Sequence, residues 1–186
     1  MVLRRLPHIL TLIRLFAAPV VAWLLLRSQF WQALALVLVA GVTDWLDGFA
    51  ARRLGVSGRL GVTLDPLADK ALLVTLFVVL RVVALLPFWL VALVIGRDVV
   101  ILAGALALRV FRKWSRFPPS NLGKVSTFFQ IVLVLLVLLD AAFPNELFRW
   151  LRRIAVALAG LFTAASGVDY VRRGIKLATG PAVSPP

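Results

Sequence analysis

Six long apolar segments, joined by short polar connections, constrain what this chain can fold into more than any other feature. Their apolar residues run on without strict alternation, which is typical of helices rather than of half-buried strands. An α-helix needs roughly 20 mostly apolar residues to cross a bilayer, and its backbone satisfies its own hydrogen bonds there. The sequence therefore predicts an all-α polytopic membrane protein, a bundle of about six transmembrane helices, over Ile9–Leu26, Trp31–Ala51, Val62–Leu80, Pro87–Leu108, Val125–Leu139 and Leu147–Val168.

Composition supports a bilayer as the solvent. Hydrophobic residues make up 62% of the chain, charged residues 16%, and the mean hydropathy is +0.99. A soluble domain carries about a quarter charged residues. There is no cysteine, which excludes disulfide and thiol chemistry. We expect one membrane domain over residues 1–177, with a retained first helix, and a disordered tail over residues 178–186, which is rich in Pro, Gly and Ser.

The net charge of +13 is best explained by basic residues in the loops of a membrane protein, which interact with anionic lipid headgroups. No patch of basic and aromatic residues lies outside the apolar segments, so we expect no nucleic-acid partner. Basic residues are concentrated in alternate connections, which predicts that both termini and the connection with Arg59 face the cytoplasm. The expected location is the inner (cell) membrane of a bacterium.

Four aspartates are gathered within one short stretch, although the chain has only eight acidic residues against 21 basic ones. On a helix, Asp44 and Asp47 share a face, and so do Asp65 and Asp69 on the next helix. One charged side chain at the centre of a membrane helix costs about 2.5–3.5 kcal/mol, so four carboxylates need compensation. Divalent cations prefer oxygen ligands, and two ions about 3.5–4 Å apart form a clamp for phosphoryl transfer.

The residues between these aspartates are consistent with a phosphate ligand. Gly48 and Ala51 leave space beside the carboxylates, and Arg52 can offer a forked pair of donors to a phosphate. Taken singly, small residues in membrane helices more often serve helix packing, and a terminal arginine more often anchors at the interface. It is their combination with the aspartates that favours a binding site.

The pattern Asp44-x-x-Asp47-Gly48-x-x-Ala51-Arg52, followed after eight residues by Gly61-x-x-x-Asp65-x-x-x-Asp69, resembles the signature of the CDP-alcohol phosphatidyltransferases at every fixed position. The stretches Pro7–Arg14 and Gly123–Thr127 also resemble this family. The resemblance implies a six-helix membrane enzyme whose site opens to the cytoplasm. Such an enzyme transfers a phosphatidyl group from CDP-diacylglycerol to an alcohol and releases CMP, with Mg²⁺ or Mn²⁺ as cofactor. Family members often form homodimers.

The resemblance also implies roles for individual residues. Two divalent ions would be held by Asp44, Asp47, Asp65 and Asp69, and Asp69 would also be the general base for the acceptor hydroxyl. CDP-diacylglycerol would be bound by Gly48, Ala51, Arg52 and Gly61.

The acceptor alcohol is predicted less directly. The stretches TDWLDGFAARR, LDPLADK and GKVST most resemble the phosphatidylglycerophosphate synthases, whose acceptor is glycerol 3-phosphate. A small anionic acceptor needs cations, and Arg97 and Lys124 are the candidates, with Arg112 and Arg116 behind them. His8 stands where these synthases usually carry Asn. The Gly96-Arg97-Asp98 stretch resembles the cardiolipin synthases of the same family, which use phosphatidylglycerol, and Asp98 is expected to orient Arg97 or to form a structural ion pair with it.

A small cation or proton-coupled transporter is the alternative of another class, since intramembrane acids also line transport pathways. It does not explain the Gly, Ala and Arg residues between the aspartates. The sequence also shows no internal repeat, which many secondary transporters have.

Overall fold

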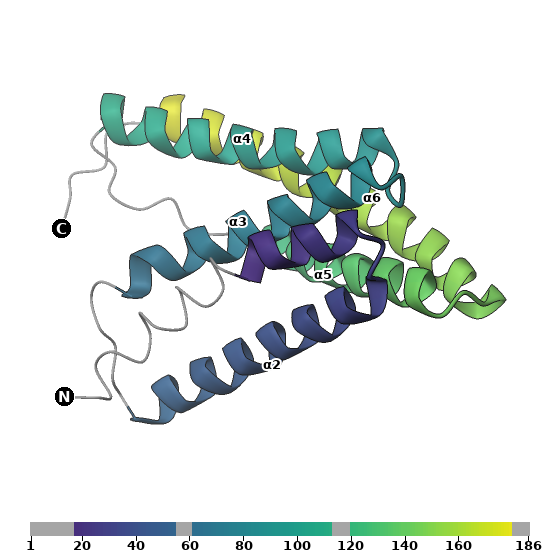
Figure 1. Ribbon diagram of the computed structural model, residues 1–186. Helices are drawn as coiled ribbons and strands as arrows, with labels where there is room; N and C mark the ends of the chain where they lie inside the picture. Colours follow the sequence, from purple (N-terminus) through teal and green to yellow (C-terminus); the bar gives the residue numbers. More distant parts are fainter. Residues whose placement is uncertain (1–16, 55–60, 113–119, 180–186) are drawn as a thin grey trace. The chain divides into compact units, whose positions relative to one another are not determined.

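A computed structural model describes residues 17–54, 61–112 and 120–179, and in these ranges every regular element is an α-helix. The side chains of residues 44–54, 61–69, 108–112 and 178–179 are outside the description. A helix over Ala17–Leu26 comes first, followed by five labelled helices (Figure 1). These are α2 (Phe30–Leu54), α3 (Gly61–Val82), α4 (Phe88–Arg112), α5 (Asn121–Ala142) and α6 (Glu146–Thr179). The predicted all-α class is confirmed over this part of the chain.

Three of the described helices are long and apolar enough to cross a membrane: Phe88–Ala107, Asn121–Ala142 and Glu146–Leu177. The segments Ala17–Leu26 and Phe30–Thr43 are shorter apolar helices. The described part of the chain is therefore all-helical and fits an integral membrane protein, and a total of six spans stays a prediction.

Several helices extend beyond the predicted apolar segments. The fourth was expected to end at Leu108 but runs to Arg112, and the sixth was expected to end at Val168 but runs to Thr179. Arginine, lysine, leucine and alanine are good helix formers, so the helix continues where hydropathy falls. At 1.5 Å per residue, α6 is about 50 Å long and exceeds the hydrocarbon thickness of about 30 Å. It also enters the segment predicted as a tail by two residues, and residues 180–186 lie outside the described part.

Two tight helix ends turn the chain without glycine. After the first helix, Ser28 N–H donates to Leu25 O at 3.0 Å and Gln29 N–H donates to Leu24 O at 2.9 Å. The bonds after α3 repeat this pattern, and Ser28 and Ala84 take φ values of 57° and 59°. This is the Schellman arrangement, in which the left-handed residue usually is glycine. Non-glycine residues there indicate that the flanking helices hold the turns in place.

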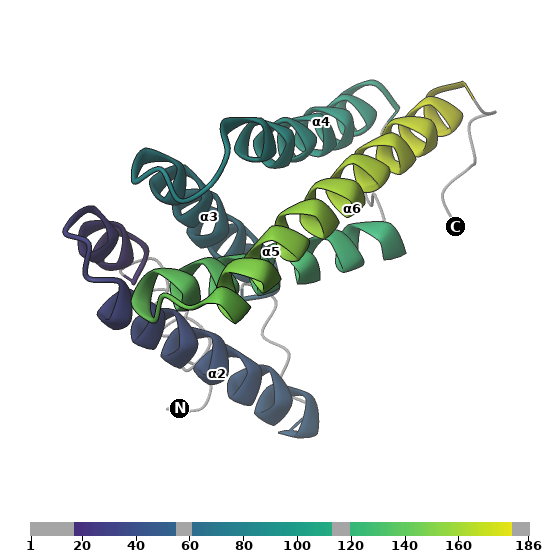
Figure 2. The ribbon, with the colours of Figure 1, turned by 90° about the vertical axis from the view of Figure 1, so that its right-hand side faces the viewer.

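The chain divides into two compact units, and each has its own core. The first comprises residues 1–86 and 134–149, with buried Leu25, Phe77 and Leu80, and with Trp31 and Phe143 packed edge to face at 5.4 Å. The second comprises residues 87–133 and 150–186 and contains α4, the first part of α5 and most of α6 (Figure 2).

Packing in the second unit depends on one small residue of α6. A Cβ at Gly160 would lie 2.8 and 2.9 Å from ring carbons of Trp89 on α4, closer than atoms pack in proteins. On the α5 side, Phe129 stacks on Phe162 with centroids 4.6 Å apart. Gly160 therefore allows α4 to approach α6, as small residues do in membrane helices.

Replacement of Gly160 with leucine is expected to destabilise the second unit. Overpacking costs about 1–3 kcal/mol, and the effect would appear as a lower unfolding temperature of the purified protein in detergent. Gly174→Leu is the matched control on the same helix, because a Cβ at Gly174 meets nothing within 4 Å. Equal unfolding temperatures for the two variants would contradict this account of the α4–α6 contact.

Candidate active site

Arg97 on α4 is a charged residue with a largely buried side chain and with partners from two helices. Its side chain is only 8% exposed, and its Nη1 donates to Asp98 Oδ1 at 2.7 Å. From α6, Ser166 Oγ accepts hydrogen bonds from Nε and Nη2 of Arg97 at 3.3 and 3.0 Å. The guanidinium carbon also lies 5.4 Å from the ring centroid of Tyr170. Because a buried guanidinium is costly unless its donors are satisfied, these contacts fix its position. The predicted pairing of Arg97 with Asp98 is confirmed.

Tyr170 ties this arginine to the start of α5. Its hydroxyl accepts a hydrogen bond from the backbone N–H of Ser120 at 3.0 Å. Ser120 is fully buried and caps α5, since its Oγ accepts from Gly123 N–H at 2.9 Å and its carbonyl accepts from Lys124 N–H at 3.1 Å. Serine is among the preferred residues for this capping position. One side chain of α6 thus contacts both the arginine of α4 and the first turn of α5.

Gly123 makes this close approach possible. A Cβ at this position would lie 2.9 Å from Tyr170 Oη and 3.1 Å from Arg97 Nη2. The first turn of a helix carries partial positive charge, and here it meets a guanidinium. Two positive groups face each other, and Lys124 follows in the same turn with an exposed side chain. Asp98 offsets part of this charge, and a bound anion would offset more.

A second polar cluster holds α5 against α6. Ser126, Gln130 and Thr163 are each 1% exposed or less. Ser126 Oγ lies 3.1 Å from Thr163 Oγ1, and Gln130 Nε2 donates to both at 3.3 and 3.0 Å. Hydrogen bonds between apolar helices of this kind hold membrane bundles together. The cluster fixes α5, which Ser120 caps, against α6, on which Tyr170 lies.

The predicted metal and CDP-diacylglycerol residues lie on the expected helices. Asp44 and Asp47 are in α2, with Gly48, Ala51 and Arg52, while Asp65 and Asp69 are in α3, which begins at Gly61. Their side chains lie outside the described residues, so the convergence of the four carboxylates stays a prediction. Among the side chains that are described, no three His, Cys, Asp or Glu residues form a group that could hold a metal.

The predicted acceptor residues fall into two groups. Arg97 and Lys124 come from different helices but lie close together, because Gly123, the residue before Lys124, packs against the guanidinium of Arg97. Arg112 ends α4, with its side chain outside the description, and Arg116 lies outside the described residues.

Sequence reasoning missed Ser166 and Tyr170 as contacts of Arg97. A signal is present in the sequence, because Thr163, Ser166 and Tyr170 follow the i, i+3, i+7 spacing of one helix face at the end of the last apolar segment and just beyond it. Ser120 also precedes an apolar run, which is typical of a helix cap.

Comparison with known proteins agrees with the signature on α2 and α3. The family model for CDP-alcohol phosphatidyltransferase matches residues 4–165. This range covers most of the chain, and the protein belongs to the CDP-alcohol phosphatidyltransferase family.

Relatives of this chain carry the names of two kinds of enzyme in this family. The chain is 33% identical over 177 residues to the CDP-diacylglycerol–glycerol-3-phosphate 3-phosphatidyltransferase of Aquifex aeolicus, covering 92% of this chain and 96% of that protein. It is 32% identical over 188 residues to the chloroplastic enzyme of the same name from rice, covering 92% of this chain. It is also 33% identical over 190 residues to the human cardiolipin synthase (CMP-forming), covering 91% of this chain. The match spans only 56% of the rice protein and 62% of the human one.

Proposed function

We propose that this protein transfers a phosphatidyl group from CDP-diacylglycerol to glycerol 3-phosphate and releases CMP in phospholipid biosynthesis. Family membership supports the reaction class. The observation that carries the choice of an anionic acceptor is the buried Arg97 held against the first turn of α5, next to Lys124. A guanidinium at a helix N-terminus suits a phosphate group. Arg112 and Arg116 would add to the positive potential.

The four aspartates would hold the metal. They supply only hard oxygen donors, which fits Mg²⁺ or Mn²⁺ and fits two ions in one site. When bound, the ions would stabilise negative charge on the phosphate groups. Gly48, Ala51, Arg52 and Gly61 would bind the cytidine diphosphate part of the donor. Asp69 would accept the proton of the acceptor hydroxyl as its oxygen bonds to the phosphorus that carries diacylglycerol and the bond from that phosphorus to CMP breaks.

A second candidate acceptor is phosphatidylglycerol. The similarity to cardiolipin synthases from human and rat favours it, as does the Gly96-Arg97-Asp98 stretch. Its phosphodiester is also an anion, so Arg97 would bind this acceptor as well. The family assignment leaves the transporter alternative without support. We further propose a bacterial inner membrane location with the site facing the cytoplasm, and a homodimer as the assembly.

The proposal predicts CMP release that depends on both metal and acceptor. Purified protein in detergent would receive CDP-diacylglycerol and Mg²⁺ with glycerol 3-phosphate, phosphatidylglycerol or inositol phosphate, and CMP would be measured. We expect release with glycerol 3-phosphate and its loss with EDTA, restored by excess Mg²⁺ or Mn²⁺. Release with phosphatidylglycerol alone would assign the second candidate. No release from folded protein with any acceptor would contradict the proposed function.

A further inference from the structure

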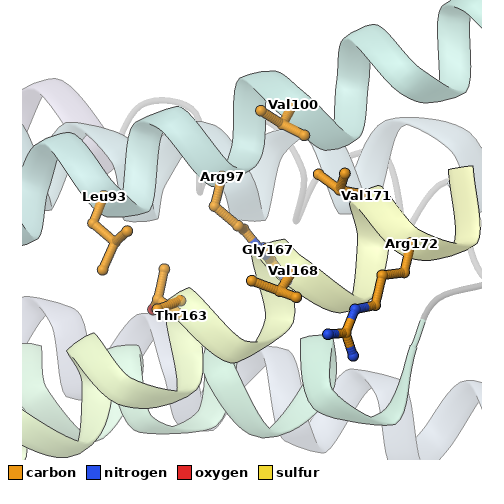
Figure 3. A pocket seen from close by; sticks show the side chains of 9 residues that line it. Leu93, Arg97, Val100, Thr163, Gly167, Val168, Val171 and Arg172 are labelled. Carbon is orange, nitrogen blue, oxygen red and sulfur yellow. The ribbon is translucent and has the colours of Figure 1, made fainter. Parts of the chain in front are cut away.

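A groove runs between α4 and α6 in the second unit, at some distance in sequence from the aspartate motif. Its volume is about 440 Å³. Figure 3 shows the side chains that line it. Its walls are apolar and include Leu93 and Val100 on α4 and Ala164, Val168 and Val171 on α6. Both helices are candidate membrane spans. The groove therefore suits an extended hydrocarbon chain rather than a polar solute.

The floor of the groove is open because Gly167 has no side chain. A Cβ there would lie 3.8 Å from Cγ of Arg97 and 4.0 Å from its Cβ, which is ordinary contact. A larger side chain at this position would project into the groove. Arg97 also lines the groove, and its guanidinium is hydrogen-bonded to Asp98 and Ser166.

Among the described residues, one arginine at the groove carries a charge that no neighbour pairs. Arg172 lines the groove and is exposed, and it has no hydrogen bond or ion pair to any residue in the described part of the chain. Its neighbour Arg173 differs, because its Nε lies 3.0 Å from both carboxylate oxygens of Asp169, with a hydrogen bond to Oδ1. Arginine binds phosphate through paired donors, and each basic residue near a bilayer surface attracts anionic lipid by about 1 kcal/mol.

An apolar groove lined by an exposed arginine that no described residue pairs has the chemistry of a phospholipid site. We propose that the α4–α6 groove binds one anionic phospholipid, with an acyl chain between the apolar walls and the phosphate on Arg172. The family match ends at residue 165, so Gly167, Val171 and Arg172 lie beyond the matched range. The proposal does not depend on the acceptor or on turnover.

The test measures lipid binding to delipidated protein by native mass spectrometry, in EDTA and without CDP-diacylglycerol. The probes are dioleoylphosphatidylserine and dioleoylphosphatidylcholine, neither of which is a candidate acceptor, with inorganic phosphate as a headgroup control. We expect one phosphatidylserine to bind more tightly than phosphatidylcholine, and inorganic phosphate not to compete at equal concentration. Arg172→Gln should weaken phosphatidylserine binding about five- to tenfold.

Arg173→Gln is the matched control, because it removes the same charge at the adjacent position and should change the affinity less than twofold. Gly167→Leu should weaken the binding of both lipids by filling the floor of the groove. Ala164→Leu is a second filling variant, should Gly167→Leu fail to fold. Equal affinity of the wild type for the two lipids, or equal losses in Arg172→Gln and Arg173→Gln, would overturn the proposal. A filling variant that converts dimer to monomer without changing lipid binding would instead assign the groove to a second copy of the chain.

Discussion

Replacement of Asp69 with asparagine is expected to reduce CMP release by about 10³-fold or more. A positioned general base contributes about 10²–10⁴-fold, and asparagine cannot accept the proton of the acceptor hydroxyl. The amide oxygen keeps one neutral donor atom, so the variant should keep part of its binding of metal and CDP-diacylglycerol. The measurement is CMP release at saturating substrates, with donor binding measured separately.

Glu146→Gln provides a matched control for this change. Glu146 is an exposed carboxylate at the start of α6 that pairs with Arg149 at 2.6 Å, and it belongs to no candidate site. Its replacement should leave turnover unchanged. Full activity of Asp69→Asn would show that another group takes the proton.

Replacement of Arg97 with alanine is expected to raise the acceptor KM about 10- to 100-fold while the donor KM changes much less. This range corresponds to about 1.4–2.8 kcal/mol, the scale of a lost charge-assisted contact with a phosphate. The measurement is a pair of kinetic titrations, one with each substrate varied. Equal effects on the two KM values would mean that Arg97 does not bind the acceptor.

A double variant separates binding from a purely structural role. Arg97→Ala removes the guanidinium that lies 2.7 Å from Asp98 Oδ1, and breaking a largely buried ion pair by removing one partner is expected to destabilise the protein. Arg97→Met combined with Asp98→Asn removes the ion pair as a whole and should recover thermal stability. If Arg97 binds the acceptor, the acceptor KM of the double variant stays high. If the arginine is only structural, activity returns together with stability.

The sequence predicted most of the helices and the local features of the site. Long apolar runs located α4, α5 and α6, and adjacency alone suggested the Arg97–Asp98 pair. The sequence did not predict hydrogen bonds between distant segments of the chain. Arg97 and Ser166 are 69 residues apart, and Ser120 and Tyr170 are 50 apart. Hydropathy reports the preference of a segment for lipid and contains no information about which helix becomes its neighbour. The predicted helix ends were wrong because hydropathy marks where a segment leaves the hydrocarbon, whereas a helix with basic residues continues beyond that point.

Gly123 has a consequence for how α5 can move. A shift of α5 by one residue against α6, in which the helix moves along its axis and also turns about it, would bring Leu122 or Lys124 to the place where even a single Cβ would lie 2.9 Å from Tyr170 Oη. The absence of a side chain at Gly123 therefore fixes the register of α5 against α6, because the two adjacent registers would place a side chain in this contact. The hydroxyl of Tyr170 holds that register through the N–H of Ser120. A displacement of the first turn of α5 that keeps this hydrogen bond would carry Tyr170 with it, together with the Arg97 guanidinium that lies 5.4 Å from its ring centroid.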